Sequence, residues 1–400
     1  MGIDIFKKVL RYFQEHVSLL VIIIFVIVEF LINPIGEFCL NDDWAYAKAV
    51  KTYLETSELK FSFWQAIPGL PLVFTGIFFS KLFGFSFTLL RLISVGCVII
   101  STLLIDSNLK RLAVSKTNRL LVLMLFVFNP LTISLGNSFM PDVFQMFLGI
   151  VCFHFMILYL GNRSVLHFLL FIVFSVLLCL NRQTGVLIPI VFAIIFLIIE
   201  KRNVKNLGLA VLPFVITYAV LFIFEYSAKS ILPQNYNLQL NNILATLLHP
   251  NLSSVKTIGY YFITSTVCLG LFILPFTISS LKENYELLKR SLLSKIIFVG
   301  YFSLISIKLF YSGNVFPFVG NMFYHLGVGP VILTGFNTDE NQVLPFFTTC
   351  IWACLNFVGG LSFFISLQSI IKKQQDSVQI NSSKLFFPDT FCVVFVAIVF

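Results

Sequence analysis

Charge and histidine are scarce in this sequence. Among its 400 residues, 11% are Asp, Glu, Lys or Arg and five are His, whereas 58% are hydrophobic. A soluble protein of this length could not bury so much apolar surface, because a globular core stops growing with chain length. The composition therefore excludes an ordinary soluble enzyme. The net charge of +9 is interpreted as a signal of membrane topology rather than of nucleic-acid binding.

The ligand spacing of a metal site is also missing. His249 and His325 fall in predicted outer loops, but no cluster of further ligands surrounds either residue. Cys350 and Cys354 share a helix face without a second ligand pair beside them, so we interpret them as packing residues. The sequence therefore indicates no certain cofactor, and a divalent cation held by the two histidines is the alternative.

No cleavable signal peptide is evident. Residues 17–35 form a long apolar run without a small-residue cleavage site, so this run is predicted to remain as the first membrane span. Lys7, Lys8 and Arg11 precede it and place the N-terminus in the cytoplasm by the positive-inside rule. Residues 391–400 are apolar but too short to span a bilayer, so we expect the C-terminus to be truncated.

Long apolar runs are abundant. Many of them approach or reach the ~20 residues that cross a bilayer, and the mean hydropathy is +0.95. They predict an all-α polytopic membrane protein with about 10–12 transmembrane helices. We predict spans at residues 17–35, 85–105, 120–136, 143–160, 165–180, 186–199, 207–226, 258–281, 296–311 and 344–371, with long outer loops near 227–257 and 313–344.

Residues 66–84 decide the orientation of every span after them. They are apolar but contain prolines and glycines, and at about 1.5 Å per residue they would barely cross the bilayer core. If they cross, the basic loop 106–119 lies outside the cell. If they only dip into the outer leaflet, that loop is cytoplasmic, as the positive-inside rule favours. We therefore predict that residues 66–84 do not cross.

This topology brings acidic residues to the outer face. Asp42 and Asp43 follow the first span, directly before a predicted amphipathic interfacial helix at residues 44–54, and Asp142 follows the third span. As an alternative reading, each of these acids could simply cap the helix that it precedes. Of the first two, we expect Asp43 to be the helix cap and Asp42 to point toward a ligand.

Cationic residues are predicted at the same level. Arg182 emerges after the fifth span, and Arg91 lies about two turns inside the second, where an arginine must meet a carboxylate, a phosphate or water. Interfacial snorkelling of Arg182 and an inter-helix ion pair of Arg91 are the alternatives. Lys308 adds a further cation near the outer end of the ninth span. Together with the acids, these residues indicate an extracytoplasmic site for an anionic, lipid-linked substrate.

The order of these motifs resembles the type C glycosyltransferase (GT-C) superfamily, which includes protein O-mannosyltransferases (family 39) and bacterial lipid A aminoarabinose transferases. The resemblance rests on an acidic pair before a short amphipathic helix, a Pro-containing apolar stretch ending in Leu-Phe-Gly, an arginine early in the second span, an acid in the second outer loop and a basic residue after the fifth span. These are Asp42-Asp43-Trp44-Ala45-Tyr46-Ala47, Pro68–Pro71 with Leu82-Phe83-Gly84, Leu90-Arg91-Leu92, Asp142 and Arg182. The family's frequent His-Pro-Pro is replaced by Ile67-Pro68-Gly69-Leu70-Pro71, so its histidine has no counterpart here.

The resemblance implies a division of the chain. Residues 1–200 would be the GT-C-like transmembrane catalytic module, and residues 201–400 a variable transmembrane module with two long external loops. It also implies an inverting hexosyl- or pentosyltransferase in a bacterial cytoplasmic membrane, with an extracytoplasmic active site. This enzyme would move a sugar from a polyprenyl-phosphate donor to a lipid, glycan or protein acceptor.

Each predicted site residue receives a role on this reading. Asp42 would be the general base, Asp142 would position the acceptor or help to stabilise the oxocarbenium-like centre, and Asp43 would be a further catalytic residue of the same site. Arg91, Arg182, Tyr46 and Lys308 would bind substrate, the arginines through phosphate. A flippase or transporter and an oligosaccharide polymerase are the competing classes, and a donor-transfer assay would separate them from the glycosyltransferase.

Overall fold

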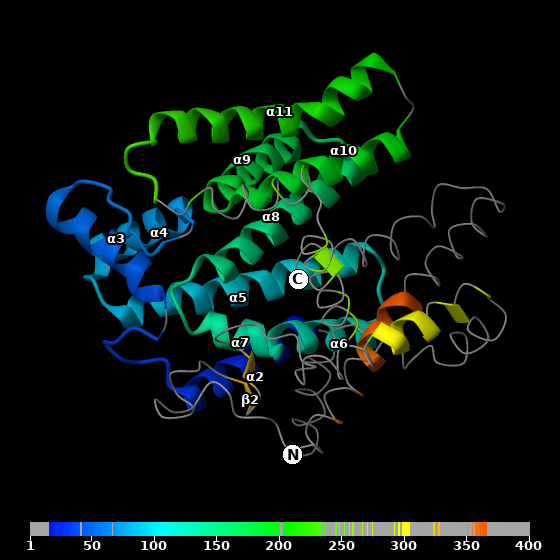
Figure 1. Cartoon of the computed structure of the whole chain (residues 1–400), viewed down its shortest axis with the longest axis horizontal. Coiled ribbons are helices and arrows are strands. Elements are labelled where there is room, and N and C mark those ends of the chain that lie inside the picture. Colours follow the sequence, from blue (N-terminus) through cyan, green and yellow to red (C-terminus); the bar gives the residue numbers. More distant parts are fainter. Residues whose placement is uncertain are drawn as a thin grey trace, which may run out of the picture. The chain divides into compact units, whose positions relative to one another are not determined.

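The computed structural model describes residues 16–233 except 41, 66, 201 and 202, then Tyr236, then isolated residues and short runs between 245 and 365 (Figure 1). The chain divides into two compact units, residues 1–241 and 242–398. In the second unit a two-residue strand β1 (Phe323–Tyr324) pairs antiparallel with β2 (Gly327–Val328). The predicted spans at 258–281, 296–311 and 344–371 fall largely outside the described residues. The functional boundary near residue 200 stays a prediction.

The first unit is a bundle of apolar helices. Its elements are α2 (Val17–Ile32), α3 (Asp43–Thr56), α4 (Leu70–Phe83), α5 (Phe87–Arg111), α6 (Lys116–Val127), α7 (Pro130–Gly136), α8 (Pro141–Asn162), α9 (Val165–Asn181), the 3-10 turn η1 (Gln183–Val186), α10 (Leu187–Ile199) and α11 (Val204–Ser227). Helices α5, α8 and α11 are long and apolar enough to cross a membrane, and α2, α4, α9 and the η1–α10 pair are shorter apolar helices. The chain is therefore a helical integral membrane protein, as predicted.

The long helices α5 and α8 run parallel. Near their first turns, Ser94 of α5 donates its hydroxyl to the carbonyl of Ser138, just before α8, at 2.8 Å. Further along both helices, Asn108 Oδ1 and His154 Nδ1 lie 2.7 Å apart. We call the end with the first turns of α5 and α8 the site end, and the opposite one the far end.

Helix α9 returns antiparallel to α8. At the far end Tyr159 of α8 packs on Phe168 of α9, and Phe192 and Phe196 of α10 extend this aromatic cluster. Arg163, which follows α8, forms an ion pair with Glu200 after α10. These contacts hold α8, α9 and α10 together at the far end, so that the connection between α9 and η1 lies at the site end.

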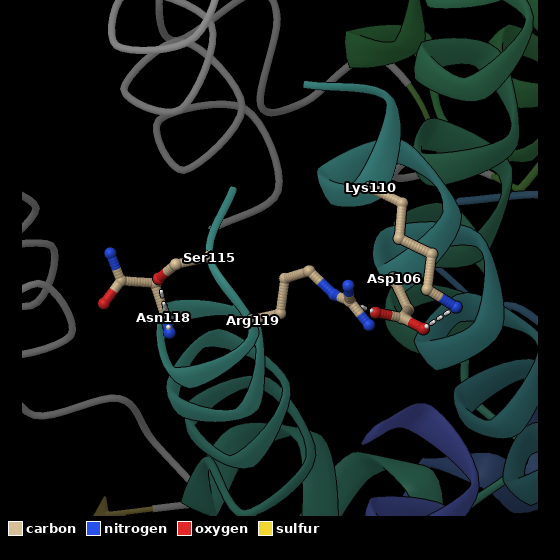
Figure 2. Close-up of polar contacts among 5 residues, drawn as sticks. All are labelled: Asp106, Lys110, Ser115, Asn118 and Arg119. Atoms are coloured by element: carbon tan, nitrogen blue, oxygen red, sulfur yellow. Dashed lines mark hydrogen bonds and ion pairs between the residues drawn. The ribbon is translucent and has the colours of Figure 1, made fainter. Parts of the chain in front are cut away.

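The far end of the α5–α6 hairpin is locked by a buried ion pair (Figure 2). Asp106, only 1% exposed, accepts a hydrogen bond from Arg119 Nε at 2.8 Å and lies 2.8 Å from Lys110 Nζ. Ser115 caps α6 by accepting the N–H of Asn118. Residues 106–119 were predicted to be a basic loop, whereas α5 continues to Arg111. The acid neutralises part of the positive charge of this segment.

The predicted third span, residues 120–136, is not one helix. The chain breaks at Asn129, whose side chain accepts the N–H of Leu131 and caps α7, and Pro130 occupies its first turn. Proline lacks the N–H that would continue α6, and the residue before a proline disfavours helical backbone. The Asn129-Pro130 dipeptide is a helix-boundary signal in the sequence, but the continuous apolar run around it was interpreted as a single span.

Helices α3 and α4 lie side by side at the site end (Figure 1). A Cβ added to Gly69, which precedes α4, would lie 3.7 Å from Cβ of Pro141 at the start of α8. A Cβ added to Gly76, in the middle of α4, would lie 2.9 Å from Val50 of α3 and 3.2 Å from Leu90 of α5. Helix α5 then begins only a few residues after α4 ends. The segment from 67 to 86 therefore begins beside the first turn of α8 and ends beside the first turn of α5. That this segment does not cross a membrane stays a prediction.

Candidate functional site

An ion pair joins Asp142 and Arg182 at the site end. Asp142 lies in the first turn of α8, Arg182 directly follows α9, and Arg182 Nη1 donates to Asp142 Oδ1 at 2.8 Å. Both side chains are 31% exposed. The pair is thus a polar feature that a ligand can reach, and the structure brings together two of the residues that the sequence predicted for one site.

Buried contacts fix this pair in place. Asn181, fully buried, donates its amide to the carbonyl of Pro141 at 3.1 Å and to Gln145 Oε1 at 3.0 Å. At Gly185 an added Cβ would lie 2.7 Å from the carbonyl carbon of Leu178, so any larger residue would push η1 away from α9. The end of α9 is therefore docked on the start of α8, which holds the backbone of Arg182 beside the first turn of α8.

Tyr46 of α3 connects this pair with the acidic segment after α2. Its side chain is buried, and burial raises the pKa of its hydroxyl, to which the charges of Asp142 and Asp42 add while Arg182 acts in the opposite direction. The Tyr46 hydroxyl therefore lies within electrostatic reach of both acids and the arginine. It is a neutral donor at any physiological pH.

Gly69 makes room for the Tyr46 ring. A Cβ on Gly69 would lie 3.1 Å from Cε1 of Tyr46 and 3.7 Å from Cβ of Pro141, and its φ of +56° favours glycine. The chain before α4 is thus packed between α3 and α8. This contact explains the Pro-Gly sequence at 68–69 without any role for the histidine that the resembling family carries there.

The two adjacent acids diverge. Asp43 is fully buried, and its Oδ1 accepts the N–H of Leu40 at 3.0 Å. Asp42 is half-buried, and its Oδ1 accepts the indole N–H of Trp64 at 2.9 Å. The expectation that Asp43 caps α3 is wrong: Asp42 occupies the cap position without a side-chain capping bond, and Asp43 turns back toward the preceding segment. Of the two acids, Asp42 is the one that solvent and ligands can reach.

Arg91 holds the segment that leads to Asp42. It is 1% exposed, and its guanidinium donates to the carbonyls of Pro34 at 3.1 Å, Gly36 at 3.0 Å and Phe38. It also lies 4.8 Å from the centre of the Phe38 ring. These contacts give Arg91 a positioning role for residues 34–38. They show no inter-helix ion pair, and phosphate binding by Arg91 stays a prediction.

Glu37 fastens the same segment from the other side. Its carboxylate accepts the N–H of Phe87 at 2.9 Å, the N–H of Thr88 at 3.3 Å and the hydroxyl of Thr88 at 2.9 Å. These N–H groups belong to the first turn of α5, which carries the positive end of the helix dipole. The segment before Asp42 is therefore anchored to the start of α5 by two oppositely charged side chains.

Gln183, the residue after Arg182, belongs to a second polar group that the sequence did not predict. Glu225, in the last turn of α11, accepts at Oε1 from Gln183 Nε2 and from the Tyr236 hydroxyl, both at 2.8 Å. A carboxylate near the end of an apolar helix is a functional signal in membrane proteins, and this rule could have singled out Glu225. Trp64 was missed too, because its contact with Asp42 spans a loop without a local pattern.

The remaining predicted ligands cannot be placed. Lys308, His249 and His325 lie outside the residues that the structure describes. Within the described part of the chain, no three His, Cys, Asp or Glu side chains are grouped to hold a metal ion. A divalent cation therefore stays a sequence-based alternative.

No family model and no curated protein matches this chain. Among solved structures, it is similar to an oligosaccharyltransferase of Archaeoglobus fulgidus, crystallised with zinc and sulfate, with 13% identity and a TM-score of 0.38. The alignment covers 96% of this chain and 53% of that chain, so the present chain spans about half the length of its match. A likeness this remote assigns neither a family nor an activity.

Proposed function

We propose that this protein is an inverting, GT-C-like membrane glycosyltransferase that moves a sugar from a polyprenyl-phosphate donor to an acceptor hydroxyl. The observation that carries the proposal is the partly exposed ion pair of Asp142 and Arg182, 2.8 Å apart, together with Tyr46, whose hydroxyl is affected by the charges of Asp142, Arg182 and Asp42. These residues come from separate elements, α3, α8 and the end of α9. A reachable acid and a reachable arginine are the groups that such a transfer requires.

Asp42 is the proposed general base. One carboxylate oxygen is held by the Trp64 indole, and the other makes no hydrogen bond to the described residues. The free oxygen accepts the proton of the acceptor hydroxyl as its oxygen attacks the anomeric carbon. The bond from this carbon to the phosphate oxygen breaks, and polyprenyl phosphate leaves with the electron pair. A single displacement inverts the anomeric centre.

Arg182 is the proposed ligand of the donor phosphate. Only Nη1 is engaged by Asp142, which leaves further N–H groups of the guanidinium for phosphate oxygens. Asp142 keeps the guanidinium oriented, and charge that develops on the leaving phosphate meets a preorganised cation. The phenol of Tyr46 is a neutral donor beside both groups. Asp43 supports the segment before Asp42 and takes no direct part.

The site end is proposed to be extracytoplasmic. The far end of the α5–α6 hairpin carries Lys110, Arg111 and Lys116, and short basic segments stay in the cytoplasm. Single cysteines at Lys60 and Leu112, in a protein without native cysteines, test this orientation. A membrane-impermeant reagent should label the first position and spare the second in intact cells. Labelling of both would contradict the orientation and the placement of the site.

A transfer assay tests the function. Purified protein in lipid nanodiscs receives polyprenyl-phosphate lipids labelled in the sugar, with native membrane extract as the source of acceptor. A glycosyltransferase transfers the label and releases polyprenyl phosphate, and Asp42→Asn abolishes both. Glu55→Gln, which changes an exposed acid on α3, is the matched control. A flippase would do neither, and a polymerase would need a diphosphate-linked oligosaccharide.

A further inference from the structure

Glu225 is an acid that the proposed chemistry leaves without a task. It lies in the last turn of α11, an apolar helix long enough to cross a membrane, where an ionisable side chain is costly. No lysine or arginine forms an ion pair with it among the described residues. Its partners are instead two neutral donors, Gln183 and Tyr236. A carboxylate near the end of an apolar helix with only neutral donors as partners is a candidate for a functional role.

The contacts of Glu225 leave half of its carboxylate open. Both neutral donors bind Oε1, each at 2.8 Å, and Oε2 makes no hydrogen bond within the described part of the chain. Glu225 is half-buried, so the residue keeps part of its surface accessible. Burial, followed by Glu225 itself, raises the pKa of the Tyr236 hydroxyl, which therefore stays protonated and remains a donor.

The location of this group relates it to the ion pair. Gln183 directly follows Arg182, and η1 is pressed against the end of α9 by the close approach at Gly185. Arg182 and Gln183 therefore move as one rigid turn, with the Asp142 contact on the first residue and the Glu225 contact on the second. Gln183 thus links the carboxylate of Glu225 to the turn that carries the cation of Arg182.

We infer that Gln183, Glu225 and Tyr236 form a hydroxyl-binding subsite, in which Glu225 Oε2 accepts a hydrogen bond from a sugar hydroxyl of the donor while Arg182 holds its phosphate. A neutral polyhydroxylated ring suits this group because a carboxylate repels an anion and binds hydroxyl donors through strong, charge-assisted hydrogen bonds. The inference rests on the proposed function. It assigns specificity for the sugar to α11 and the segment that follows it.

The decisive measurement compares two lipids on one protein. Sugar-free polyprenyl phosphate and polyprenyl-phosphoryl hexoses (glucose, mannose and galactose) are titrated onto wild-type protein in nanodiscs. In Glu225→Gln the carboxamide keeps the shape and can still accept from Tyr236, but it lacks the charge. We expect the best hexose lipid to bind about ten-fold more weakly to this variant, because a charged acceptor is replaced by a neutral one. The sugar-free lipid should bind unchanged.

Deoxygenated donors identify the hydroxyl concerned. A hexose lipid lacking that hydroxyl should bind wild type and Glu225→Gln equally, which isolates the pairwise interaction. Tyr236→Phe should weaken the hexose lipid less than Glu225→Gln does, since it only loosens the carboxylate. Glu55→Gln should leave both lipids unaffected. The melting temperatures of all variants are measured in parallel.

Each contrary result has its own meaning. Equal loss for the sugar-free and the hexose lipid in Glu225→Gln would make Glu225 a structural tie and overturn the inference. The inference would also fall if no deoxygenated donor removed the difference, or if hexose binding required an added divalent cation that Glu225→Gln no longer binds. Wild-type protein that binds neither lipid and transfers no sugar would overturn the proposed function itself.

Discussion

Trp64 donates its indole N–H to one carboxylate oxygen of Asp42 across 22 residues of chain, and the second oxygen makes no hydrogen bond to the residues that the structure describes. The indole itself is 54% exposed, so it is not held there by burial. The two carboxylate oxygens of Asp42 thus differ: the indole orients one, and the other is the proposed general base. It gives the exposed loop between α3 and α4 a place in the proposed chemistry.

Replacement of Trp64 by Phe tests the orienting contact. The variant keeps an aromatic ring and loses the N–H, so Asp42 can rotate away from the acceptor. We expect kcat to fall about ten-fold, the worth of one hydrogen bond to a charged group, while the KM for the donor changes little. Phe63→Leu, at the neighbouring exposed ring, is the control. Unchanged kcat in Trp64→Phe would leave the indole as an interfacial anchor.

The two adjacent acids should fail in different ways. Asp42→Asn is expected to fold normally and lose transfer by about 10²–10⁴-fold, the usual contribution of a general base. Asp43→Asn places an amide N–H₂ in the fully buried site that accepts the N–H of Leu40, so it should lose about 1–3 kcal/mol of stability. Turnover and thermal unfolding of both variants decide the matter. A stable but inactive Asp43→Asn would reverse the two assignments.

Arg182 should control donor affinity. Arg182→Ala is expected to weaken binding of polyprenyl phosphate ten- to a hundred-fold, since a charge-assisted contact contributes ~1.5–3 kcal/mol. Arg182→Lys should retain part of the affinity, because it keeps the charge but not the planar fork. Arg163→Ala removes an arginine of the far end, paired with Glu200, and serves as the control. Equal affinities for all four proteins would reduce Arg182 to a structural partner of Asp142.

Glu37, in the segment between α2 and α3, should make the stability of the protein depend on pH. Slight desolvation raises the pKa of its carboxyl, but the hydrogen bonds from Phe87 and Thr88 outweigh this and lower it. With a lower pKa in the folded state, the stabilisation is complete above the usual glutamate range near ~4.3 and is lost as the pH falls through the folded value. Between pH 6 and pH 3 the melting temperature of wild type should therefore fall further than that of Glu37→Gln. Parallel curves would show that the capping contact contributes nothing.

The helical class and the proximity of Asp142 and Arg182 could be predicted from the sequence because they depend on local features, whereas the outer location of this pair and the non-crossing of residues 66–84 stay predictions. Apolar length identifies spans, the basic loop sets their direction, and the order of spans then decides which charges share a face. The sequence therefore predicted Asp42, Asp142 and Arg182 for one face. That prediction depends on the number of crossings assigned between them.

The partners of individual side chains did not follow, because they are contacts between distant segments. Arg91 was expected at a carboxylate, a phosphate or water, and its hydrogen bonds to the backbone carbonyls of Pro34 and Gly36 are contacts that no composition rule reveals. Glu225 meets Gln183 across 42 residues. The sequence could assign Asp42 and Asp43 to one site, but it could not predict which hydrogen-bond donor each carboxylate meets or which of the two occupies the cap position of α3.

The parallel course of α5 and α8 has an electrical consequence. Both helices direct their N-terminal dipole ends, each equivalent to roughly half a positive charge, toward the site end. Glu37 balances the end of α5, and Asp142 balances that of α8 as well as Arg182. The negative charge of Asp142 therefore lowers the positive potential that would attract an anion, although the same carboxylate also orients Arg182. Neutralising it in Asp142→Asn should tighten the hold on polyprenyl phosphate while slowing its release as product, so affinity for the lipid and turnover would move in opposite directions.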